Sequence, residues 1–246
     1  MKFWGNMAHL RPREVLLQYP AIVSSMAEML HSEDVTAQTV ALETLGYIGV
    51  SLEGKSALLE SGNLLTDCVD KLASLLHDSC TELKISVLNT LASLLKLDKE
   101  NQSPEMLSVT ESWFRRSPDL IVTVTGLIKQ PFLDLRYHYS PFSVSLSDGV
   151  MIRLAGYQLL LVLAGQDWGR SLVMSQPGFC ESLLDRSREN QKDGKLERWR
   201  LVERLVESRN AKQLLGPQID IQMRQFVKEG PYYVQVQSEV AYDEQE

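Results

Sequence analysis

The chain has 246 residues, of which 44% are hydrophobic, and its formal net charge is −7. A chain of this length can bury a sizeable core, whereas nucleic-acid binding needs a basic surface, and no cluster of Lys and Arg provides one here. The longest apolar run, Leu159 to Ala164, is far shorter than the roughly 20 residues that cross a membrane. We therefore expect neither nucleic acid nor a membrane among its partners.

Apolar residues recur at helical spacing from the start of the chain, at Phe3, Trp4, Met7 and Leu10, and no capping residue precedes them. Terminal repeats of helical repeat proteins normally carry a polar outer face. We therefore expect a preceding element to cover this helix, as it would if the chain were part of a longer protein.

Two helices are predicted next, over Pro20–Leu30 and Val35–Val50. In the second helix, apolar residues recur at i, i+3, i+4, i+8 and i+11 from Ala37, which is one stripe of a 3.6-residue period. Ser32 to Asp34 supply the turn and the N-cap between the two helices.

The same pattern returns 46 positions later. Met26–His31 is matched by Leu72–His77 in residue type, which predicts a second pair of helices over Asn63–Leu76 and Glu82–Leu97. His31 and His77 fall at equivalent helix ends, where a cationic or donor side chain suits the helix dipole. With one histidine in each unit, neither a metal site nor a catalytic triad can be assembled, and we expect a protein that is not an enzyme.

A third pattern links Gly54–Gly62 with Gly169–Gly178, at an offset of 115 residues. Four further helices are predicted after the second pair, over Arg153–Ala164, Phe179–Asn190, Lys195–Ser208 and Ile219–Val227. The first and last repeat steps, of 46 and about 45 residues, lie within the ~40–47 residues of HEAT and armadillo units, but the interval between them, of 69 residues, is too long for one unit. We therefore predict an all-α fold, a right-handed α-solenoid of armadillo/HEAT-like helix pairs over residues 1–228.

Two segments depart from this pattern. Residues 137–152 are rich in serine, contain Pro141 and lack a helical stripe, and we interpret them as a loop-like insertion. At the end of the chain, Gly230-Pro231 halts the last helix. Residues 229–246 then form an aromatic and finally acidic tail, in which Tyr232 and Tyr233 could dock on the last repeat and the remainder is flexible.

Gly49, Gly54, Lys55 and Ser56 match the G-x-x-x-x-G-K-S pattern of a phosphate-binding loop. A true phosphate-binding loop follows a buried strand, but the preceding residues have helical periodicity. Gly169-Arg170-Ser171 repeats the later part of the pattern without the upstream glycine. We interpret the match as a chance one that marks a turn between repeats, and expect no cofactor, although nucleotide binding stays an alternative.

The three cysteines, Cys68, Cys80 and Cys180, are odd in number, widely spaced and outside any C-x-x-C pattern. Neither a disulfide framework nor a structural zinc site is indicated, and we expect no bound metal. We interpret all three as small buried apolar residues in a reducing compartment.

The repeat offsets place Glu43, Asn89, Gln158 and Glu203 at matching positions on the second helix of successive pairs. Tyr47 and Glu207 lie one helical turn further along. We predict that this acidic and polar ridge binds a basic or helical surface of a partner protein. The alternative is that these are ordinary exposed polar positions.

Several segments in order resemble one family: Phe3–Pro12, Tyr19-Pro20, Leu42–Gly49, Gln176–Phe179, Asp185–Ser187 and Glu229–Val234. It is the family of armadillo/HEAT-repeat chaperones that assemble the base of the 26S proteasome, and the similarity covers the carboxyl-terminal half of its members. The segment at 137–152 departs from the family by interrupting what would be one helix.

The resemblance implies a scaffold without catalytic residues that binds the carboxy-terminal region of a proteasomal AAA-ATPase subunit and other base assembly intermediates. It would leave before the mature proteasome forms, and its expected location is the cytoplasm, with the nucleus as a second location. The other reading is a generic armadillo/HEAT adaptor for an unrelated partner.

Overall fold

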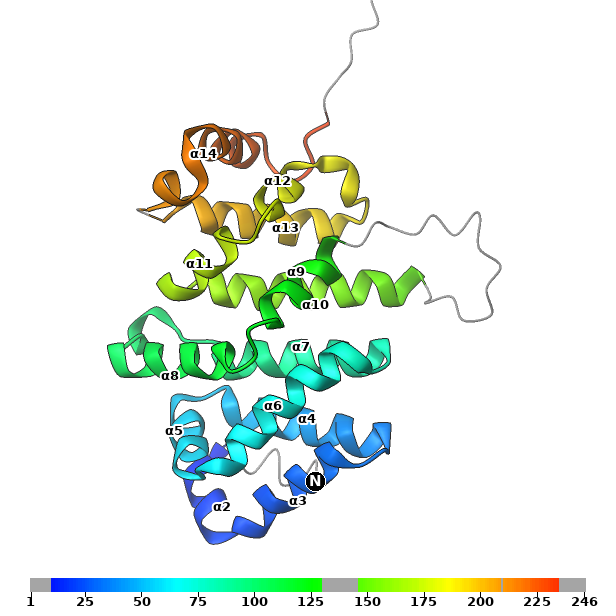
Figure 1. Cartoon of the computed structure of the whole chain (residues 1–246), viewed down its shortest axis with the longest axis vertical. Helices are drawn as coiled ribbons and strands as arrows, with labels where there is room; N and C mark the ends of the chain where they lie inside the picture. Colours follow the sequence, from blue (N-terminus) through cyan, green and yellow to red (C-terminus); the bar gives the residue numbers. More distant parts are fainter. Residues whose placement is uncertain (1–9, 130–145, 209, 235–246) are drawn as a thin grey trace, which may run out of the picture.

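A computed structural model describes residues 10–129, 146–208 and 210–234, and throughout these ranges the regular secondary structure is helical (Figure 1). The helices are α2 (Pro12–Gln18), α3 (Pro20–His31), α4 (Val35–Gly49), α5 (Leu52–Glu60), α6 (Asn63–Asp78), α7 (Thr81–Leu95), α8 (Pro104–Arg115), α9 (Leu120–Lys129), α10 (Leu146–Ala164), α11 (Asp167–Met174), α12 (Phe179–Leu184), α13 (Lys192–Val206) and α14 (Ala211–Glu229). Among the described helices, none is both long and apolar enough to cross a membrane.

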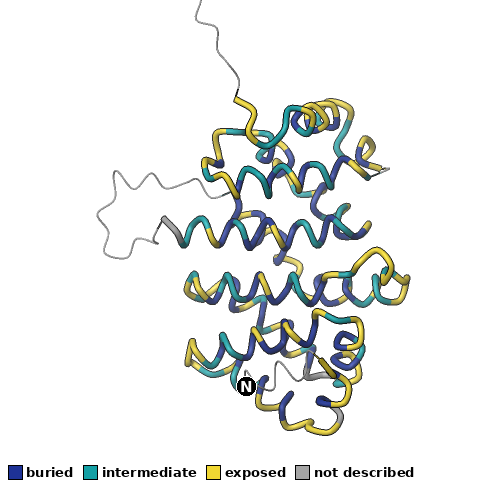
Figure 2. Tube along the Cα trace, turned by 180° about the vertical axis from the view of Figure 1, so that it is seen from behind, coloured by how far each residue is buried: buried dark blue, intermediate teal, exposed yellow. Residues whose placement is uncertain are grey.

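Two ladders of helices run along the molecule. Helices α4, α7, α10 and α13 pack on one another in that order, and the view from behind shows them roughly parallel, one above the next (Figure 2). Helices α3, α6, α9 and α12 form the second ladder, also in contact in chain order, and cross the first obliquely (Figure 1). The predicted all-helical stack of packed layers is confirmed.

The repeat positions form the shared core. Leu45, Leu91, Leu160 and Leu205 are equivalent residues of successive ladder helices, and each is at most 3% exposed. Each packs between its own layer and the next, within one continuous hydrophobic cluster. The sequence repeat therefore reflects one core position that is equivalent in every layer and is filled there by an apolar side chain.

In the first two pairs, most observed helix ends lie within two or three residues of the predicted ends, because capping groups fix them. The Asp34 side chain accepts a hydrogen bond from the backbone N–H of Thr36 at 2.9 Å and begins α4. The buried side chain of Gln38 donates to the Ser32 carbonyl at 2.8 Å and holds the turn that precedes it.

The prediction that the phosphate-loop pattern marks a turn between repeats is wrong. Gly54, Lys55 and Ser56 lie inside α5, and Gly169 and its neighbours lie inside α11. Each layer therefore contains a short helix followed by two helices, as in α5, α6 and α7 or α11, α12 and α13. The short helices have only 8 and 9 residues, too few for their apolar periodicity to stand out in the sequence.

The interval that seemed too long for the repeat holds two unpredicted helices, α8 and α9. Helix α10 starts at Leu146, so the expected loop over 137–152 is wrong for residues 146–152, and residues 130–145 lie outside the described ranges. The helix expected over Arg153–Ala164 is only the later part of α10.

Two boundaries near the end of the chain also differ from the prediction. The helix expected over Phe179–Asn190 ends at Leu184, because the Asp185 side chain caps a 3₁₀ turn at Arg186–Arg188 instead. The short helix expected over Ile219–Val227 is part of the longer α14, which is kinked where Gly216 adopts a φ of 77°.

Gln166 is fully buried and joins three helices through its side-chain amide. Its Nε2 donates to the Leu95 carbonyl at 2.7 Å, while its Oε1 accepts from the Thr110 hydroxyl and from Trp168 Nε1, both at 2.9 Å. These bonds satisfy the last turn of α7, a hydroxyl of α8 and an indole of α11 together.

Replacing Gln166 by Leu should therefore lower the free energy of unfolding by about 2–4 kcal/mol, since the buried Leu95 carbonyl and the half-buried Trp168 indole N–H would lose their partner. The Thr110 hydroxyl keeps the Met106 carbonyl as an acceptor, at 3.1 Å. Urea denaturation followed by circular dichroism measures the change. Gln158→Leu on the exposed face of α10 is the control and should change stability by less than about 0.5 kcal/mol. Equal effects of the two substitutions would contradict this role of Gln166.

The three cysteines differ in environment, so the expectation that all are buried is wrong for Cys80. Cys68 and Cys180 are buried, whereas Cys80 is exposed at the N-cap of α7. Burial, with a smaller contribution from Asp67, raises the pKa of Cys68 to about 11. Burial, with a smaller contribution from Glu181, raises the pKa of Cys180 to about 12.

A thiol reagent such as 5,5′-dithiobis(2-nitrobenzoate) at pH 8 should accordingly modify one cysteine rapidly in the folded protein and the other two only after denaturation. The Cys80→Ser variant should lose the rapid phase. Persistence of that phase in the variant would show that a supposedly buried thiol is accessible.

Candidate protein-binding surface

The residues predicted to form the partner-binding ridge lie on successive helices of one ladder. Glu43 and Tyr47 belong to α4, Asn89 to α7, Gln158 to α10 and Glu203 to α13, and Glu207 is the C-cap of α13. All are exposed except Glu203, which is half-buried. These helices pack in sequence order, so the predicted residues lie on four consecutive helices of one ladder, and we call this set of residues the column.

A groove between α4 and α7 brings three of these residues together. It is lined by Glu43, Gly46, Tyr47, Val50, Ser86, Asn89, Thr90 and Ser93. Tyr47 is 47% exposed on its rim, so an aromatic side chain stands beside a carboxylate and an amide. Gln158, Glu203 and Glu207 do not line this groove, and they extend the column on the two layers that follow.

The groove depends on a close approach of its two helices. A Cβ atom on Gly46 would lie 3.6 Å from the Cα of Thr90, and one on Gly49 would lie only 2.5 Å from the Leu94 side chain. The Thr90 hydroxyl also donates to the Leu42 carbonyl, across the two helices, at 3.0 Å. The polar residues of this groove follow from the repeat in the sequence, whereas the need for glycine at positions 46 and 49 follows only from the packing of the two helices.

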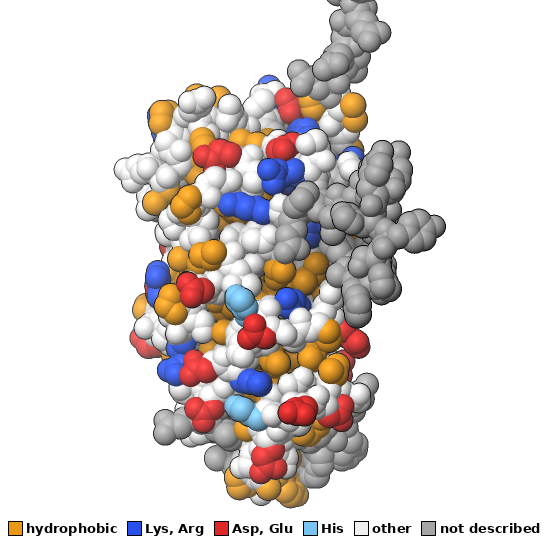
Figure 3. All heavy atoms as spheres, turned by 45° about the vertical axis from the view of Figure 1, so that its right-hand side comes forward, with side chains coloured by type: hydrophobic (Ala, Val, Ile, Leu, Met, Phe, Trp, Pro, Cys, Tyr) orange, Lys and Arg blue, Asp and Glu red, His pale blue; other side chains and the backbone are white. Residues whose placement is uncertain are grey.

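Charges on another face of the stack are mixed in sign. The space-filling view shows acidic and basic side chains interspersed along the layers, with apolar side chains between them (Figure 3). Within the described residues, no group of three or more His, Cys, Asp and Glu side chains could hold a metal ion.

The residues of the phosphate-loop pattern have a packing role. Lys55 is 1% exposed, and its Nζ donates to the carbonyls of Gly49, of Val50 at 3.3 Å and of Ser93 at 3.3 Å. A Cβ on Gly54 would lie 1.8 Å from the Ile48 carbonyl oxygen, so only glycine allows α5 to start against the end of α4. The lysine therefore caps the carboxyl ends of α4 and α7, and a helix, not a strand, precedes the pattern.

The same arrangement recurs 115 residues later. A Cβ on Gly169 would lie 2.4 Å from the Leu163 carbonyl oxygen, and Arg170 Nε donates to the Ala164 carbonyl at 2.9 Å. In both layers a glycine permits close contact and the next, basic residue caps the preceding ladder helix. The recurrence explains why Gly-Lys-Ser and Gly-Arg-Ser are matched in the sequence.

Burial lowers the pKa of Lys55 to about 8, while its value in the unfolded chain is 10.5. The contribution of Lys55 to stability is complete above pH 10.5 and is lost as the pH falls through 8, because the unfolded chain then binds the extra proton. The free energy of unfolding of the native chain relative to Lys55→Met should rise by about 2 kcal/mol between pH 7.5 and pH 9.5.

Urea denaturation of both chains at the two pH values measures this difference, and the cysteines and tyrosines common to both cancel. Lys212→Met, at an exposed position of α14, is the control and should show no such dependence. An unchanged difference for Lys55→Met would mean that the lysine keeps its ordinary pKa in the fold.

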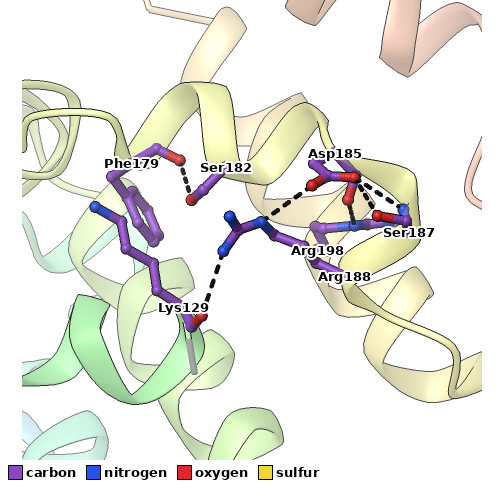
Figure 4. Close-up of polar contacts among 7 residues, drawn as sticks. All are labelled: Lys129, Phe179, Ser182, Asp185, Ser187, Arg188 and Arg198. Atoms are coloured by element: carbon purple, nitrogen blue, oxygen red, sulfur yellow. Dashed lines mark hydrogen bonds and ion pairs between the residues drawn. The ribbon is translucent and has the colours of Figure 1, made fainter. Parts of the chain in front are cut away.

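A second polar cluster joins α9, α12 and α13 (Figure 4). The Asp185 carboxylate accepts from the Ser187 hydroxyl at 2.6 Å, the Ser187 backbone N–H at 3.1 Å and Arg188 Nε at 3.1 Å, and these bonds lower its pKa. Arg188 Nη1 also donates to the Lys129 carbonyl at 3.3 Å, and Arg198 Nη1 donates to the Asp185 carbonyl at 2.7 Å.

Arg186 connects the end of α14 and the residues after it to this cluster. Its guanidinium donates to the Gly230 carbonyl at 3.0 Å and to the Glu229 carboxylate at 3.1 Å, and it lies 4.1 Å from the ring centre of Phe226. It also lies 5.2 Å from the ring centre of Tyr233. The ring centre of Tyr232, the other tyrosine predicted to dock here, lies 5.9 Å from Lys192 Nζ. Residues 235–246 lie outside the described ranges.

The fold and this surface define a class: a protein built of stacked layers of helices, in which successive ladder helices carry exposed polar residues. The model of the family described as proteasome non-ATPase 26S subunit matches residues 1–246 of the chain. The chain therefore belongs to the proteasome non-ATPase 26S subunit family.

The curated relatives are named 26S proteasome non-ATPase regulatory subunit 5. The human protein is 32% identical over 245 residues, which cover 99% of this chain and 45% of the relative. The Drosophila melanogaster protein is 24% identical over 100% of this chain and 45% of its own length. The chain thus spans a little less than half of the relatives it matches, and no solved structure matches it.

Proposed function

We propose that this chain is a non-catalytic chaperone in the assembly of the base of the 26S proteasome regulatory particle. It binds a proteasomal AAA-ATPase subunit, through the carboxy-terminal region of that subunit, and is released before the mature proteasome forms. The fold we assign to it is a right-handed α-solenoid of the armadillo/HEAT type. We place its action in the cytoplasm, with the nucleus as a second location.

One observation carries the proposal: the family match extends over residues 1–246, and the relatives are named as regulatory subunits that are not ATPases. A subunit of that kind acts through contact with other proteasome components. The stacked layers supply a surface for such contact, because the column from Glu43 to Glu207 crosses four consecutive helices of one ladder.

The chemistry of the column favours a basic partner surface. It contains three glutamates, Glu43, Glu203 and Glu207, on a chain of net charge −7. Complementary charge speeds association and selects against acidic partners. Tyr47, on the rim of the groove, is the type of side chain that most often dominates binding energy in protein interfaces.

The immobilised chain should retain one subunit from a panel of isolated proteasomal ATPase subunits. Tyr47→Ala should weaken that binding by at least about tenfold, since it removes an aromatic anchor. The double charge reversal Glu43→Lys and Glu203→Lys should weaken it further, mainly by slowing association. Surface plasmon resonance measures both rate constants.

Glu28→Lys is the matched control, because it reverses an exposed charge on α3, in the other ladder. Equal weakening by Glu28→Lys would show that the ladder of α4 is not the contact surface. Retention of no ATPase subunit at all would favour an adaptor for an unrelated protein.

The timing of release has a separate test. On native gels of assembling particles, the tagged chain should migrate with base intermediates and be absent from the complete 26S particle. Cell fractionation of the same tagged chain tests its location. A stoichiometric amount of the chain in purified mature particles would contradict a chaperone that leaves.

A further inference from the structure

Arg198 of α13 is a buried cation without a carboxylate partner. It is 2% exposed, and its one hydrogen bond among the described residues runs from Nη1 to the Asp185 carbonyl. Its Nε is shielded from solvent and has no hydrogen-bond partner. A buried charge is stabilised by an opposite charge and by satisfied donors, so an anion beside this arginine would be favourable.

The carboxylates near Arg198 are already paired with other cations. Glu189, which is 2% exposed, pairs with Arg153 at 3.1 Å, and Glu229 pairs with Arg186 at 3.1 Å. Asp185 directs its carboxylate to Arg188 at 3.1 Å and offers Arg198 only its backbone oxygen (Figure 4). The aromatic ring of Phe226, whose centre is 5.6 Å from the guanidinium carbon, is a weaker neighbour for the charge.

Arg198 lines a pocket between α13 and the segment that follows α14. The other lining residues are Arg186, Lys195, Pro231, Tyr233 and Val234. Three of the lining residues are cations, of which Arg186 is paired with Glu229, and the other three are apolar or aromatic. This concentration of positive charge stands out in a chain whose net charge is −7.

We propose that this pocket binds a carboxylate of a partner protein, carried beside an apolar side chain that lies against Pro231, Tyr233 and Val234. The guanidinium of Arg198 lines this pocket, where it can donate a charge-assisted hydrogen bond to a carboxylate. Lys195 supplies a second charge at the same site. This inference rests on the pocket alone and does not depend on the ATPase-binding proposal.

The test uses the full chain labelled with ¹⁵N and acetate as the probe. The arginine Nε–H resonances are recorded by NMR, and that of Arg198 is identified by its loss in Arg198→Lys. Acetate, at constant ionic strength, should shift this resonance with saturation in the range of about 1–10 mM, a weak affinity suited to one small anion. Acetamide has the same shape without the charge and should cause no saturable shift.

A second variant keeps the test independent of the stability of Arg198→Lys. Lys195→Gln removes one charge from the pocket and should weaken acetate binding about fivefold, by the loss of a nearby attraction. Lys212→Gln, on the exposed part of α14, is the control and should leave acetate binding unchanged.

Three outcomes would overturn the proposal. The first is no saturable shift with acetate, or an equal shift with acetamide. The second is saturation with inorganic phosphate but not with acetate, which would make the site one for phosphate. The third is a shift without added anion when the tail is neutralised by Glu239→Gln, Asp243→Asn, Glu244→Gln and Glu246→Gln, because the chain would then supply its own carboxylate.

Discussion

Each ladder helix of this protein must press an apolar face against the next, because no single layer can cover its own core. The contacts of α4 with α7, of α7 with α10 and of α10 with α13 bury the same leucine position in every layer. Burial of a leucine side chain contributes about 1.5–3 kcal/mol. Stability therefore accumulates along the stack, and a layer without a neighbour would expose this face.

Such close stacking creates a problem at the helix ends, which carry carbonyl groups that need hydrogen-bond donors. A glycine followed by a basic residue supplies these donors, as Gly54-Lys55 in one layer and Gly169-Arg170 in another. The glycine lets the short helix start against the carbonyl of the preceding helix, and the basic side chain then reaches the carbonyls that remain. The residues that match the phosphate-loop pattern thus connect neighbouring helices of the stack.

The stack leaves two kinds of surface available to other proteins. The column from Glu43 to Glu207 lies on four consecutive ladder helices and includes the groove between α4 and α7. The pocket around Arg198 is local and basic, and suits a single acidic group. The two are carried by different parts of the molecule, so one partner could use both or two partners could use one each.

The sequence by itself determined the helical class, the repeat and the approximate bounds of the long helices, because a 3.6-residue apolar period and caps such as Asp34 act locally. It also predicted a set of polar positions on successive ladder helices, of which Glu43, Tyr47 and Asn89 line one groove. The family resemblance was likewise confirmed over the whole chain.

The tertiary structure alone decided the rest. Helices α5, α9 and α11, with 9, 10 and 8 residues, are short and owe their stability to packing on their neighbours, so their local signals are weak. Helix α8 is also absent from the predicted helices, although Ser103 caps it and Pro104 begins it. The exposure of Cys80 and the capping role of Lys55 depend on where neighbouring layers lie. The contacts of Arg186 with Phe226, Glu229 and Gly230 join residues at least 40 positions apart, and the unpaired state of Arg198 depends on how those contacts use up the nearby carboxylates. Contacts between residues so far apart in the sequence produce no periodic pattern that could predict them.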